Sequence, residues 1–373
     1  MDETPLVQAH RALHAKLVDF AGWLMPIQYT GVLEEYYAVR KAAGFFDVSH
    51  MGRIEVSGDQ AEPFLQWIST NDVSRLQVGQ AQYAMVCRTS GGILDDVFVY
   101  KTGPGTFLVC VNASNREKIL QWFLENQPGK FPEATIRDRS GELAQIAIQG
   151  PASTAIMEEL MGVRIKTLKP RHCMGLEGTG VSGLLSRTGY TGEIGYEWYL
   201  PAAQASQAWD RLLKAGTAYE AKPAGLGARD LLRLEVGYLL YGNDMDEKTS
   251  PLEANAEWVV AWNKTSFQGQ PALRKQKEDG LTRQLAGFEM VERGIPRHDM
   301  TIFSNGQAVG TVTSGNFSPI LQRGIGLGYL PPVLSKEGTE VEIDIRGKRI
   351  RAKIVKPPFY RRPKSKTSLV SGS

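Results

Sequence analysis

The alternation of apolar and polar residues predicts strands joined by hairpins in the first half of the chain. Four segments alternate in this way and are separated by turns that contain Gly, Ser or Pro: residues 53–56, 83–87, 93–100 and 107–111. A helix is predicted before them at residues 34–43, with Gly44 just after its last turn, where glycine is favoured. A second helix, at residues 116–126, follows Asn115 as its expected N-cap. Strands joined by hairpins with a helix against them predict an α+β unit, with no sign of a doubly wound sheet.

The second half of the chain contains both helical and strand-like patterns of apolar residues, and strands dominate toward its end. A strand is predicted at residues 144–148 and a hairpin-like segment around 180–200. Helices are predicted in three places: from Pro151, in their first turn, to about 161, at 203–215 and at 226–236. From about residue 286 onward strands and turns dominate, which is typical of a small β-barrel or sandwich. The charged stretch 274–282, broken by Gly280, is the expected linker into this last domain.

Two adjacent aspartates, Asp95 and Asp96, lie within the strand predicted at residues 93–100. Because side chains alternate along a strand, Asp95 is expected on one face with Ile93, and Asp96 on the other with Leu94. Both faces are apolar, and burying an ionised carboxylate without partners is costly. The pair is therefore either a strand edge whose acid is hydrogen-bonded to a loop, or a carboxylate with a chemical task.

Composition places the chain among ordinary globular proteins. Its 373 residues suggest two or three domains, and 42% hydrophobic with 22% charged residues is a typical soluble balance. No apolar run approaches the roughly 20 residues that span a bilayer, and the acidic, polar N-terminus resembles neither a secretory signal nor a presequence. Three scattered cysteines form no disulfide framework, which fits a reducing compartment. We therefore expect a cytoplasmic protein with no membrane association.

Positive charge is concentrated near the C-terminus. The formal net charge is +3, and six Lys or Arg residues without any acid lie between residues 353 and 366. The rest of the chain is thus slightly negative, which argues against nucleic acid as a partner. The basic run is either a solvated tail or a local site for an anionic ligand.

Several familiar chemistries lack their motifs. There is no P-loop and no G-x-S-x-G elbow, and the one formal G-x-G-x-x-G match, at residues 178–183, follows no apolar strand. The pair His10 and His14 lacks the glutamate of a zinc motif, so a surface helix is the better interpretation and no metal site is expected. Catalysis is expected to depend on carboxylates, arginines and aromatic residues with a bound organic cofactor.

Two dense segments carry suitable residues. Residues 187–197 (RTGYTGEIGYE) and 225–247 combine glycines with Glu, Arg and Tyr. A helix surface could use such charges merely as spaced pairs. Glycines that admit a close backbone approach, flanked by Glu and Arg, also suit recognition of a flat heterocycle with donor and acceptor edges.

With these segments, most of the chain resembles the T-proteins, or aminomethyltransferases, of the glycine cleavage system. The matching segments run from end to end: residues 20–23, 44–52, 91–96, 187–197, 227–247, 250–253 and 313–319. The 91–96 segment (GGILDD) is similar to one in related folate-dependent proteins and so marks the superfamily, whereas residues 50–51 and 243–247 point to the T-proteins themselves. Departures from the family pattern at residues 262–269 and 299–300 lie outside the residues assigned to chemistry.

The resemblance implies an α+β fold with three domains arranged as a cloverleaf. Two are α+β domains, one of them ferredoxin-like, and the third is a small C-terminal β-barrel, with tetrahydrofolate in a central channel. The implied limits are residues 1–52 with 140–278, then 53–139, then 279–373 with the basic tail. The implied reaction converts the aminomethyl-dihydrolipoyl arm of the H-protein and tetrahydrofolate to dihydrolipoyl H-protein, 5,10-methylenetetrahydrofolate and ammonia.

The resemblance also implies roles for individual residues. The family's catalytic aspartate falls on Asp96, its pterin-binding glutamate on Glu197 and its folate-binding arginine on Arg229. Other folate-lining positions match four residues: Tyr83, Tyr100, Asn112 and Tyr238. The contact to the distal end of folate falls on Arg361 or Arg362, where the alignment slides by one residue.

Two relatives of the same superfamily are the competing interpretations. One is a folate-dependent demethylase that acts on a small methylated donor without a carrier protein. The other is a folate-binding iron–sulfur assembly factor, which carries a Lys-Gly-Cys-Tyr motif. This chain has Arg187-Thr188-Gly189-Tyr190 there and no cysteine, which disfavours the assembly factor.

Overall fold

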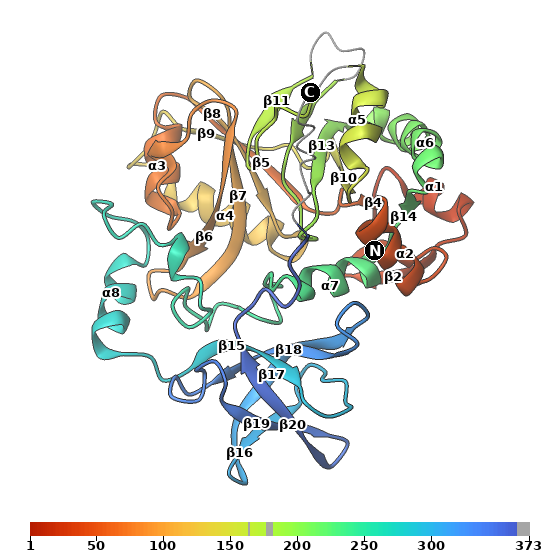
Figure 1. The fold of residues 1–373 in the computed structure, drawn as a ribbon. Helices are drawn as coiled ribbons and strands as arrows, with labels where there is room; N and C mark the ends of the chain where they lie inside the picture. Colours follow the sequence, from red (N-terminus) through yellow and green to blue (C-terminus); the bar gives the residue numbers. More distant parts are fainter. Residues whose placement is uncertain (163–164, 177–181, 364–373) are drawn as a thin grey trace, which may run out of the picture.

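The strand that carries Asp95 and Asp96 belongs to a five-stranded sheet in the computed structural model, which describes residues 1–162, 165–176 and 182–363 (Figure 1). The sheet has the order β6-β7-β8-β5-β9. Its strands are β5 (Gly52–Ser57), β6 (Gln80–Cys87), β7 (Ile93–Gly103), β8 (Thr106–Val111) and β9 (Thr135–Asp138). Helices α3 (Ala61–Ile68) and α4 (Arg116–Asn126) pack on one face and share a core with the strands. The order β9-β5-β8-β7 with two helices on one face is the ferredoxin-like arrangement.

A second sheet has six strands in the order β11-β12-β13-β10-β4-β14. They are β4 (Gly44–Asp47), β10 (Leu143–Gln149), β11 (Cys173–Gly175), β12 (Leu184–Ser186), β13 (Gly195–Pro201) and β14 (Lys222–Pro223). One face packs on α5 (Ser153–Met161) and α6 (Ala205–Gly216). The other face packs on α2 (Val32–Lys41) and α7 (Leu226–Glu235). Alternation along β4 explains this, because Phe45 lies in the first core and Phe46 in the second.

The remaining elements are short or belong to the C-terminal barrel. A small sheet and α1 (Val7–Ala12) form the N-terminus, with β1 (Asp2–Glu3), β2 (Lys16–Phe20) and β3 (Trp23–Gln28). The closed barrel contains β15 (Gln284–Met290), β16 (Thr301–Ser304), β17 (Gln307–Ser318), β18 (Arg323–Leu330), β19 (Glu340–Ile345) and β20 (Lys348–Val355). Single 3-10 turns occur at η1 (Val73–Arg75), η2 (Ala113–Asn115), η3 (Ala202–Gln204), η4 (Thr217–Tyr219) and η5 (Glu257–Val259). The predicted fold class, α+β units followed by a small β-barrel, is confirmed. The domain limits stay a prediction.

Several local predictions were wrong for identifiable reasons. Gly44 does not cap α2 but begins β4, where a Cβ would lie 2.3 Å from Val39 Cγ2. Pro151 precedes α5 instead of lying in its first turn. The charged stretch expected as a linker is mostly helix, α8 (Gln270–Asp279), with a proline at its start. His10 was expected on the surface of a helix, but it is fully buried. Its ring is satisfied there by hydrogen bonds with Asp47 and Tyr29.

The aspartate strand also departs from strict alternation. A register shift between Val86 and Cys87, opposite this end of β7, marks a β-bulge. Ile93 consequently packs with Met85, on the side of Asp96, and Leu94 packs in the core beneath α3 and α4. The residues before the bulge therefore face the opposite sides from those expected.

Two features predicted from the sequence fall on segments that the structure does not describe. The G-x-G-x-x-G match lies mostly outside the described residues, as do the basic residues Lys364 and Lys366. Among the described residues, none of the helices is both long enough and apolar enough to cross a membrane.

A buried ionic cluster joins the second sheet, the barrel and the C-terminal segment. Arg40 donates to Glu235 Oε2 at 2.6 Å and to Glu193 Oε1 at 2.8 Å. Ser318, in β17 of the barrel, donates to Glu235 Oε1. After β20 the chain returns to this cluster, where the Tyr360 N–H donates to the Glu235 carbonyl at 2.8 Å. Both ion pairs are almost inaccessible to solvent, so the cluster fixes how these three parts meet.

Candidate active site

Asp96 is held by two hydrogen-bond donors from neighbouring elements. The Tyr83 hydroxyl, on β6, donates to Asp96 Oδ2 at 2.9 Å. The Asn112 side-chain amide, just after β8, donates to Asp96 Oδ1 at 2.7 Å. Asp96 is partly exposed, whereas Asp95 is fully buried. The two donors fix one carboxylate orientation and leave lone pairs for a bound molecule.

The environment of Asp96 makes its charged form costly. Burial raises the pKa of Asp96, and the charge of Asp244 acts in the same direction. The hydrogen bonds from Tyr83 and Asn112 oppose this shift only in part. A carboxyl group whose pKa moves toward neutrality is better matched to proton transfer than an ordinary aspartate.

Glu197, on β13, lies in a network of polar side chains. Gln145 Nε2 donates to Glu197 Oε1 at 3.1 Å, and the Thr188 hydroxyl donates to Oε2. The Tyr100 hydroxyl lies 3.2 Å from Thr188 Oγ1, and the Tyr199 hydroxyl donates to Tyr100 at 3.1 Å. Tyr100 is therefore buried behind Glu197 and supports Thr188. Burial also raises the pKa of Tyr100, which keeps its phenol neutral.

Arg229 projects from α7 toward Tyr190. Its guanidinium carbon lies 4.6 Å from the centre of the Tyr190 ring, in a cation–π contact. Burial lowers the pKa of Arg229, while the phenol of Tyr190 and the charge of Glu197 raise it. Within residues 1–162, 165–176 and 182–363, no group accepts a hydrogen bond from this guanidinium. Its donors are thus available to an acceptor that is not part of the described chain.

Tyr190 connects these groups. Its ring stacks on Tyr238, with 5.8 Å between centroids and 24° between planes, and its hydroxyl donates to the Leu239 carbonyl. The charges of Asp96 and Arg229 both act on the Tyr190 phenol, whose pKa is raised chiefly by burial. Tyr190 is therefore in contact with the predicted folate arginine and is affected by the charge of the predicted catalytic aspartate. Tyr238 keeps 43% of its surface exposed.

Arg361 and Arg362 follow directly on the anchored C-terminal segment. The Tyr360 ring lies under the Arg40 guanidinium at 4.2 Å, and Pro357 packs against Gly237 at the end of α7. The segment leaves the barrel and runs upward beside α7 (Figure 1). Both arginines are exposed, so their charges are free to meet an anionic group.

Two aromatic residues of the candidate site, Trp258 and Tyr190, were not predicted as site residues from the sequence. Trp258, in η5, is 68% exposed and stacks on Tyr83 with 5.6 Å between centroids and 20° between planes. Tyr190 was noted only as part of a dense segment. An exposed aromatic residue in a short turn belongs to no helical or strand pattern of apolar residues. The sequence alone therefore does not predict that Trp258 stacks on Tyr83.

The glycines of the dense segments have packing roles that the sequence analysis did not foresee. A Cβ on Gly225 would lie 2.4 Å from the Ile27 backbone, and one on Gly189 would lie 2.0 Å from Gln149 Oε1. Gly92, just before β7 and outside these segments, has the same role: a Cβ there would lie 1.9 Å from the Glu247 carbonyl oxygen. These glycines let elements of the fold approach each other closely.

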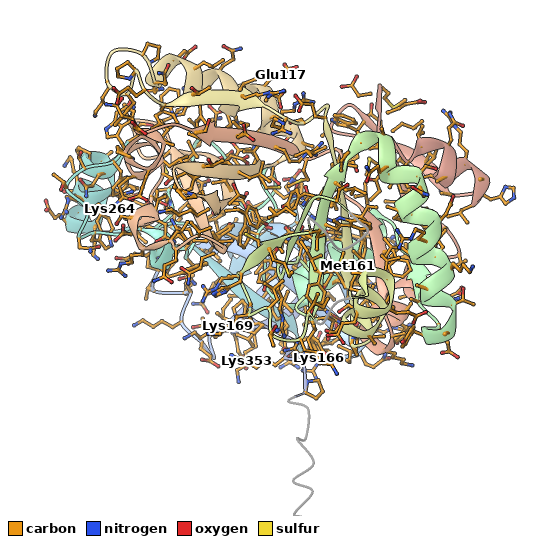
Figure 2. All side chains as sticks on the ribbon, turned by 90° about the horizontal axis from the view of Figure 1, so that it is seen from above. Glu117, Met161, Lys166, Lys169, Lys264 and Lys353 are labelled. Atoms are coloured by element: carbon orange, nitrogen blue, oxygen red, sulfur yellow. The ribbon has the colours of Figure 1, made fainter. Side chains whose placement is uncertain are left out.

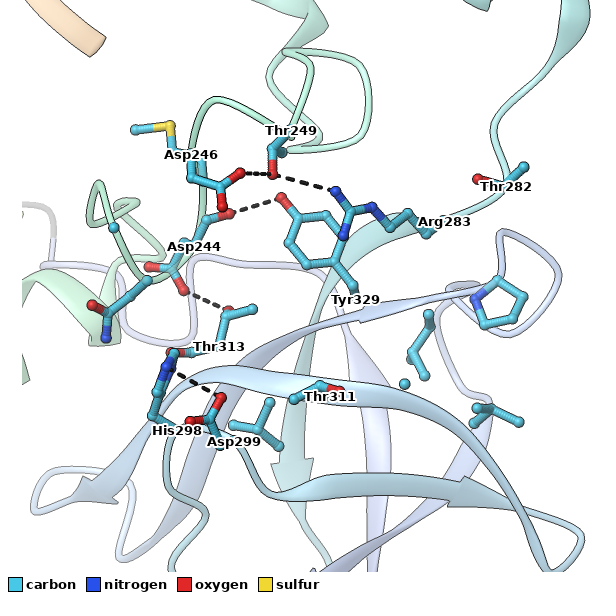
Figure 3. Close-up of a pocket in the computed structure, with 18 residues that line it drawn as sticks. Asp244, Asp246, Thr249, Thr282, Arg283, His298, Asp299, Thr311, Thr313 and Tyr329 are labelled. Atoms are coloured by element: carbon cyan, nitrogen blue, oxygen red, sulfur yellow. Dashed lines mark hydrogen bonds and ion pairs between the residues drawn. The ribbon is translucent and has the colours of Figure 1, made fainter. Parts of the chain in front are cut away.

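A separate polar hollow lies between residues 242–246 and the barrel (Figure 3). Its polar groups are largely bound to one another: Thr313 donates to Asp244 at 2.6 Å, and the Tyr329 hydroxyl donates to the Asp244 carbonyl at 2.7 Å. Arg283 lies beside Thr249 at its edge. None of the predicted site residues lines this hollow, so it is distinct from the candidate active site.

Lys264 belongs to a segment that departs from the family pattern. It is buried, and its Nζ donates to the Ser69 carbonyl at 2.6 Å and to the Asn71 carbonyl at 2.9 Å. Burial lowers its pKa to about 7. Figure 2 shows Lys264 on the side of the molecule that carries α8, away from Lys166 and Lys169. The residue ties the segment before α8 to the ferredoxin-like unit and is not part of the candidate site.

Comparisons with known proteins find relatives that match nearly the whole chain. The GCVT N-terminal domain family matches residues 6–264, and the glycine cleavage T-protein C-terminal barrel domain family matches residues 283–361. An aminomethyltransferase of Halothermothrix orenii is 47% identical over 96% of this chain and 100% of its own length. One from Desulforamulus reducens is 44% identical over 97% and 99%. The crystal structure of the glycine cleavage system aminomethyltransferase T from Bartonella henselae superposes with a TM-score of 0.91 at 32% identity, covering 97% of this chain and 98% of that one.

Proposed function

The chain belongs to the glycine cleavage T-protein family, and we propose that it acts as the aminomethyltransferase of that system. The donor is the aminomethyl group on the dihydrolipoyl arm of the H-protein, and the acceptor is tetrahydrofolate. The carbon of the donor forms bonds to two folate nitrogens, and its bonds to sulfur and to the amine nitrogen break. The products are 5,10-methylenetetrahydrofolate, the dihydrolipoyl carrier and ammonia.

The observation that carries this proposal is the convergence of three charged side chains on one loop. Glu197 from β13 accepts a hydrogen bond from Thr188, and Arg229 from α7 lies over the Tyr190 ring. Burial raises the pKa of the Tyr190 phenol, and the charge of Asp96 from β7 adds to this rise. An acid of raised pKa, a second carboxylate and an uncommitted guanidinium suit a flat, polar heterocycle that reacts through its amines.

The described residues fit tetrahydrofolate as the acceptor. Glu197 suits the amino and ring N–H edge of a pterin, because a carboxylate accepts two parallel hydrogen bonds. Arg229 has donors available for an anionic group, and the partly exposed Tyr238 is an aromatic side chain suited to contact with a flat ring. The exposed Arg361 and Arg362 suit the carboxylates at the distal end of folate. Tyr83, Tyr100 and Asn112 support the two carboxylates through the hydrogen bonds described above.

Asp96 is the residue proposed to act on the reacting amine. Tyr83 and Asn112 hold its carboxylate in one orientation, so that a free lone pair can accept a proton from a folate amine. Holding two reactants in contact supplies about 7–11 kcal/mol of a barrier in favourable systems, so positioning is the larger part of this role. The proton accepted by Asp96 is then available to the departing amine.

The cellular setting follows from the same proposal. The H-protein and folate are the proposed partners. Cys87, Cys110 and Cys173 are free, buried thiols, which supports a reducing cytoplasm as the compartment.

The decisive test is ammonia release from an aminomethyl-dihydrolipoyl H-protein with and without tetrahydrofolate. We expect release to depend on tetrahydrofolate and methylenetetrahydrofolate to appear in step with it. Folate binding without any release above background would contradict the proposal. Turnover of a small N-methylated donor without a carrier would then favour the demethylase.

Replacement of Arg229 by Gln should weaken tetrahydrofolate binding by about 10-fold or more, because a charge-assisted hydrogen bond contributes about 1.5–3 kcal/mol. Turnover at saturating folate should change much less, since Arg229 is assigned to binding. Isothermal titration and steady-state kinetics measure the two quantities. Arg75→Gln, which changes a 74% exposed side chain that pairs with Asp72, is the matched control. Unchanged folate affinity in Arg229→Gln would remove this residue from the site.

A further inference from the structure

We propose that Asp95 is a positioning residue whose fixed negative charge orients Asn112 and controls the protonation of Asp96. The inference rests on the proposed function, in which Asp96 is the reacting carboxylate. Asp95 itself is fully buried, so it acts through its neighbours and does not touch a substrate.

The hydrogen bonds of Asp95 fit only an ionised carboxylate. Asn112 Nδ2 and Asn115 Nδ2 donate to Asp95 Oδ1 at 2.8 and 2.6 Å. The Asn112 backbone N–H donates to Oδ2 at 2.9 Å. Among the described residues, every hydrogen-bond partner of this carboxylate is a donor, so none can accept a carboxyl proton.

The Asn115 side chain bonds the Asp95 carboxylate instead of capping helix α4. Asn115 occupies the N-cap position of α4, where its side chain was expected to bond the first backbone N–H groups. Its side chain forms no such bond and donates to Asp95 instead. The carboxylate is thereby held near the start of α4, where the partial positive charge of a helix favours an anion.

Asn112 transmits the effect of Asp95 to Asp96. The same Nδ2 group lies 2.8 Å from Asp95 Oδ1 and 2.7 Å from Asp96 Oδ1. Removing Asp95 would leave this amide with one carboxylate partner and free it to turn. Asp95 thus determines the geometry of a donor that Asp96 needs.

The two carboxylates also interact through their charges. Burial raises the pKa of both, and the charge of Asp96 adds to the rise at Asp95. Keeping two adjacent carboxylates ionised in a buried site costs free energy, because like charges repel. As the pH falls, one of the two therefore takes up a proton before the other. Asp95 has three N–H donors and Asp96 has one N–H and one O–H donor. The additional N–H donors favour the ionised form of Asp95, and this leaves Asp96 as the carboxylate assigned the proton in this proposal.

Other titratable groups face Asp96 from the neighbouring elements: Tyr83, Tyr190, Tyr241 and Asp244. Burial raises the pKa of each tyrosine, so all three stay neutral near pH 7. Asp244 is paired with Arg233 at 2.7 Å, which offsets its charge. Among the described residues Asp95 forms no ion pair with a cation; the only hydrogen-bond partners of its carboxylate are the three N–H donors of Asn112 and Asn115.

The test is the pH dependence of single-turnover ammonia release in Asp95→Asn. Without the neighbouring anion, Asp96 should ionise at lower pH, and the acid limb of the profile should move down by about one pH unit or more. A merely structural role would lower the rate at every pH without moving the limb. An unmoved limb in a folded Asp95→Asn that binds folate would overturn the proposal.

Infrared titration of the carboxyl band supplies a readout that needs no activity. The wild-type protein should gain the band of a protonated carboxyl group as the pH falls through about 6, above the range of an ordinary aspartate, and Asp96→Asn should lack this band because Asp95 stays ionised. Persistence of the band in Asp96→Asn would assign the proton to Asp95 and overturn the proposal, whether or not Asp95→Asn folds. Failure of the proposed function is a separate result, seen as no folate-dependent ammonia release by the wild-type protein.

Discussion

Replacement of Asp96 by Asn is expected to lower turnover by about 100-fold or more while leaving tetrahydrofolate bound, as for loss of a positioned general base. The amide has nearly the shape of the carboxylate, and its oxygen can still accept the hydrogen bond from Tyr83. The amide cannot take a proton from a folate amine, because a neutral side-chain amide is not a base near neutral pH. Rapid-quench measurement of ammonia release at saturating folate and H-protein gives the turnover, and isothermal titration gives the folate affinity.

The interpretation of Asp96→Asn depends on a comparison that holds the chemistry of the change constant. Asp59→Asn makes the same substitution at an exposed position in the turn before α3 and should behave as wild type. Turnover near the wild-type value in Asp96→Asn would show that Asp96 is not the reacting acid. A large loss of folate affinity with little loss of turnover would move Asp96 to a binding role.

The regular elements were predictable because their side chains follow a simple period. The strands around Asp96 alternate, and the helices at α6 and α7 carry one apolar face, so local sequence was sufficient. The helix α8 was mistaken for a linker because only Leu273 and its neighbour Gln270 are buried, which leaves almost no apolar stripe. The strand β4 was missed because Gly44 resembles a helix cap, whereas it is needed for close packing against Val39.

The candidate site was predictable where residues are identified by a motif and not where distant segments meet. Asp96 and Glu197 lie in segments of unusual composition, and the family resemblance assigned their roles. The stacking of Trp258 on Tyr83 arises only when η5 packs beside β6, so no local pattern reports it. The diversion of Asn115 to Asp95 was equally hidden, because the sequence of a helix start does not reveal a buried acid beside it.

Replacement of Glu235 by Ala is expected to lower the free energy of unfolding by about 3–5 kcal/mol, because it leaves the buried charge of Arg40 without its main partner. The Tyr36 hydroxyl, which lies 2.8 and 2.9 Å from the two Glu235 oxygens, and the Ser318 hydroxyl lose their acceptor as well. Urea unfolding followed by tryptophan fluorescence measures the change. Glu3→Ala removes a glutamate of an exposed ion pair with Arg11 and should cost less than about 1 kcal/mol.

The same change should also release the C-terminal segment that carries Arg361 and Arg362. Ser318 belongs to the barrel and Tyr360 to this segment, and both meet Glu235. If the cluster positions the segment, Glu235→Ala should show faster proteolysis after residue 355 and weaker folate binding than Glu3→Ala. Replacing Arg40 by Met together with Glu235 by Leu removes both charges and should recover much of the lost stability, since a buried ion pair is often no more stable than apolar residues of similar size. If the double variant recovers stability but not folate affinity, the charges serve to place the segment. An unchanged free energy of unfolding in Glu235→Ala would show that the cluster does not hold the three parts together.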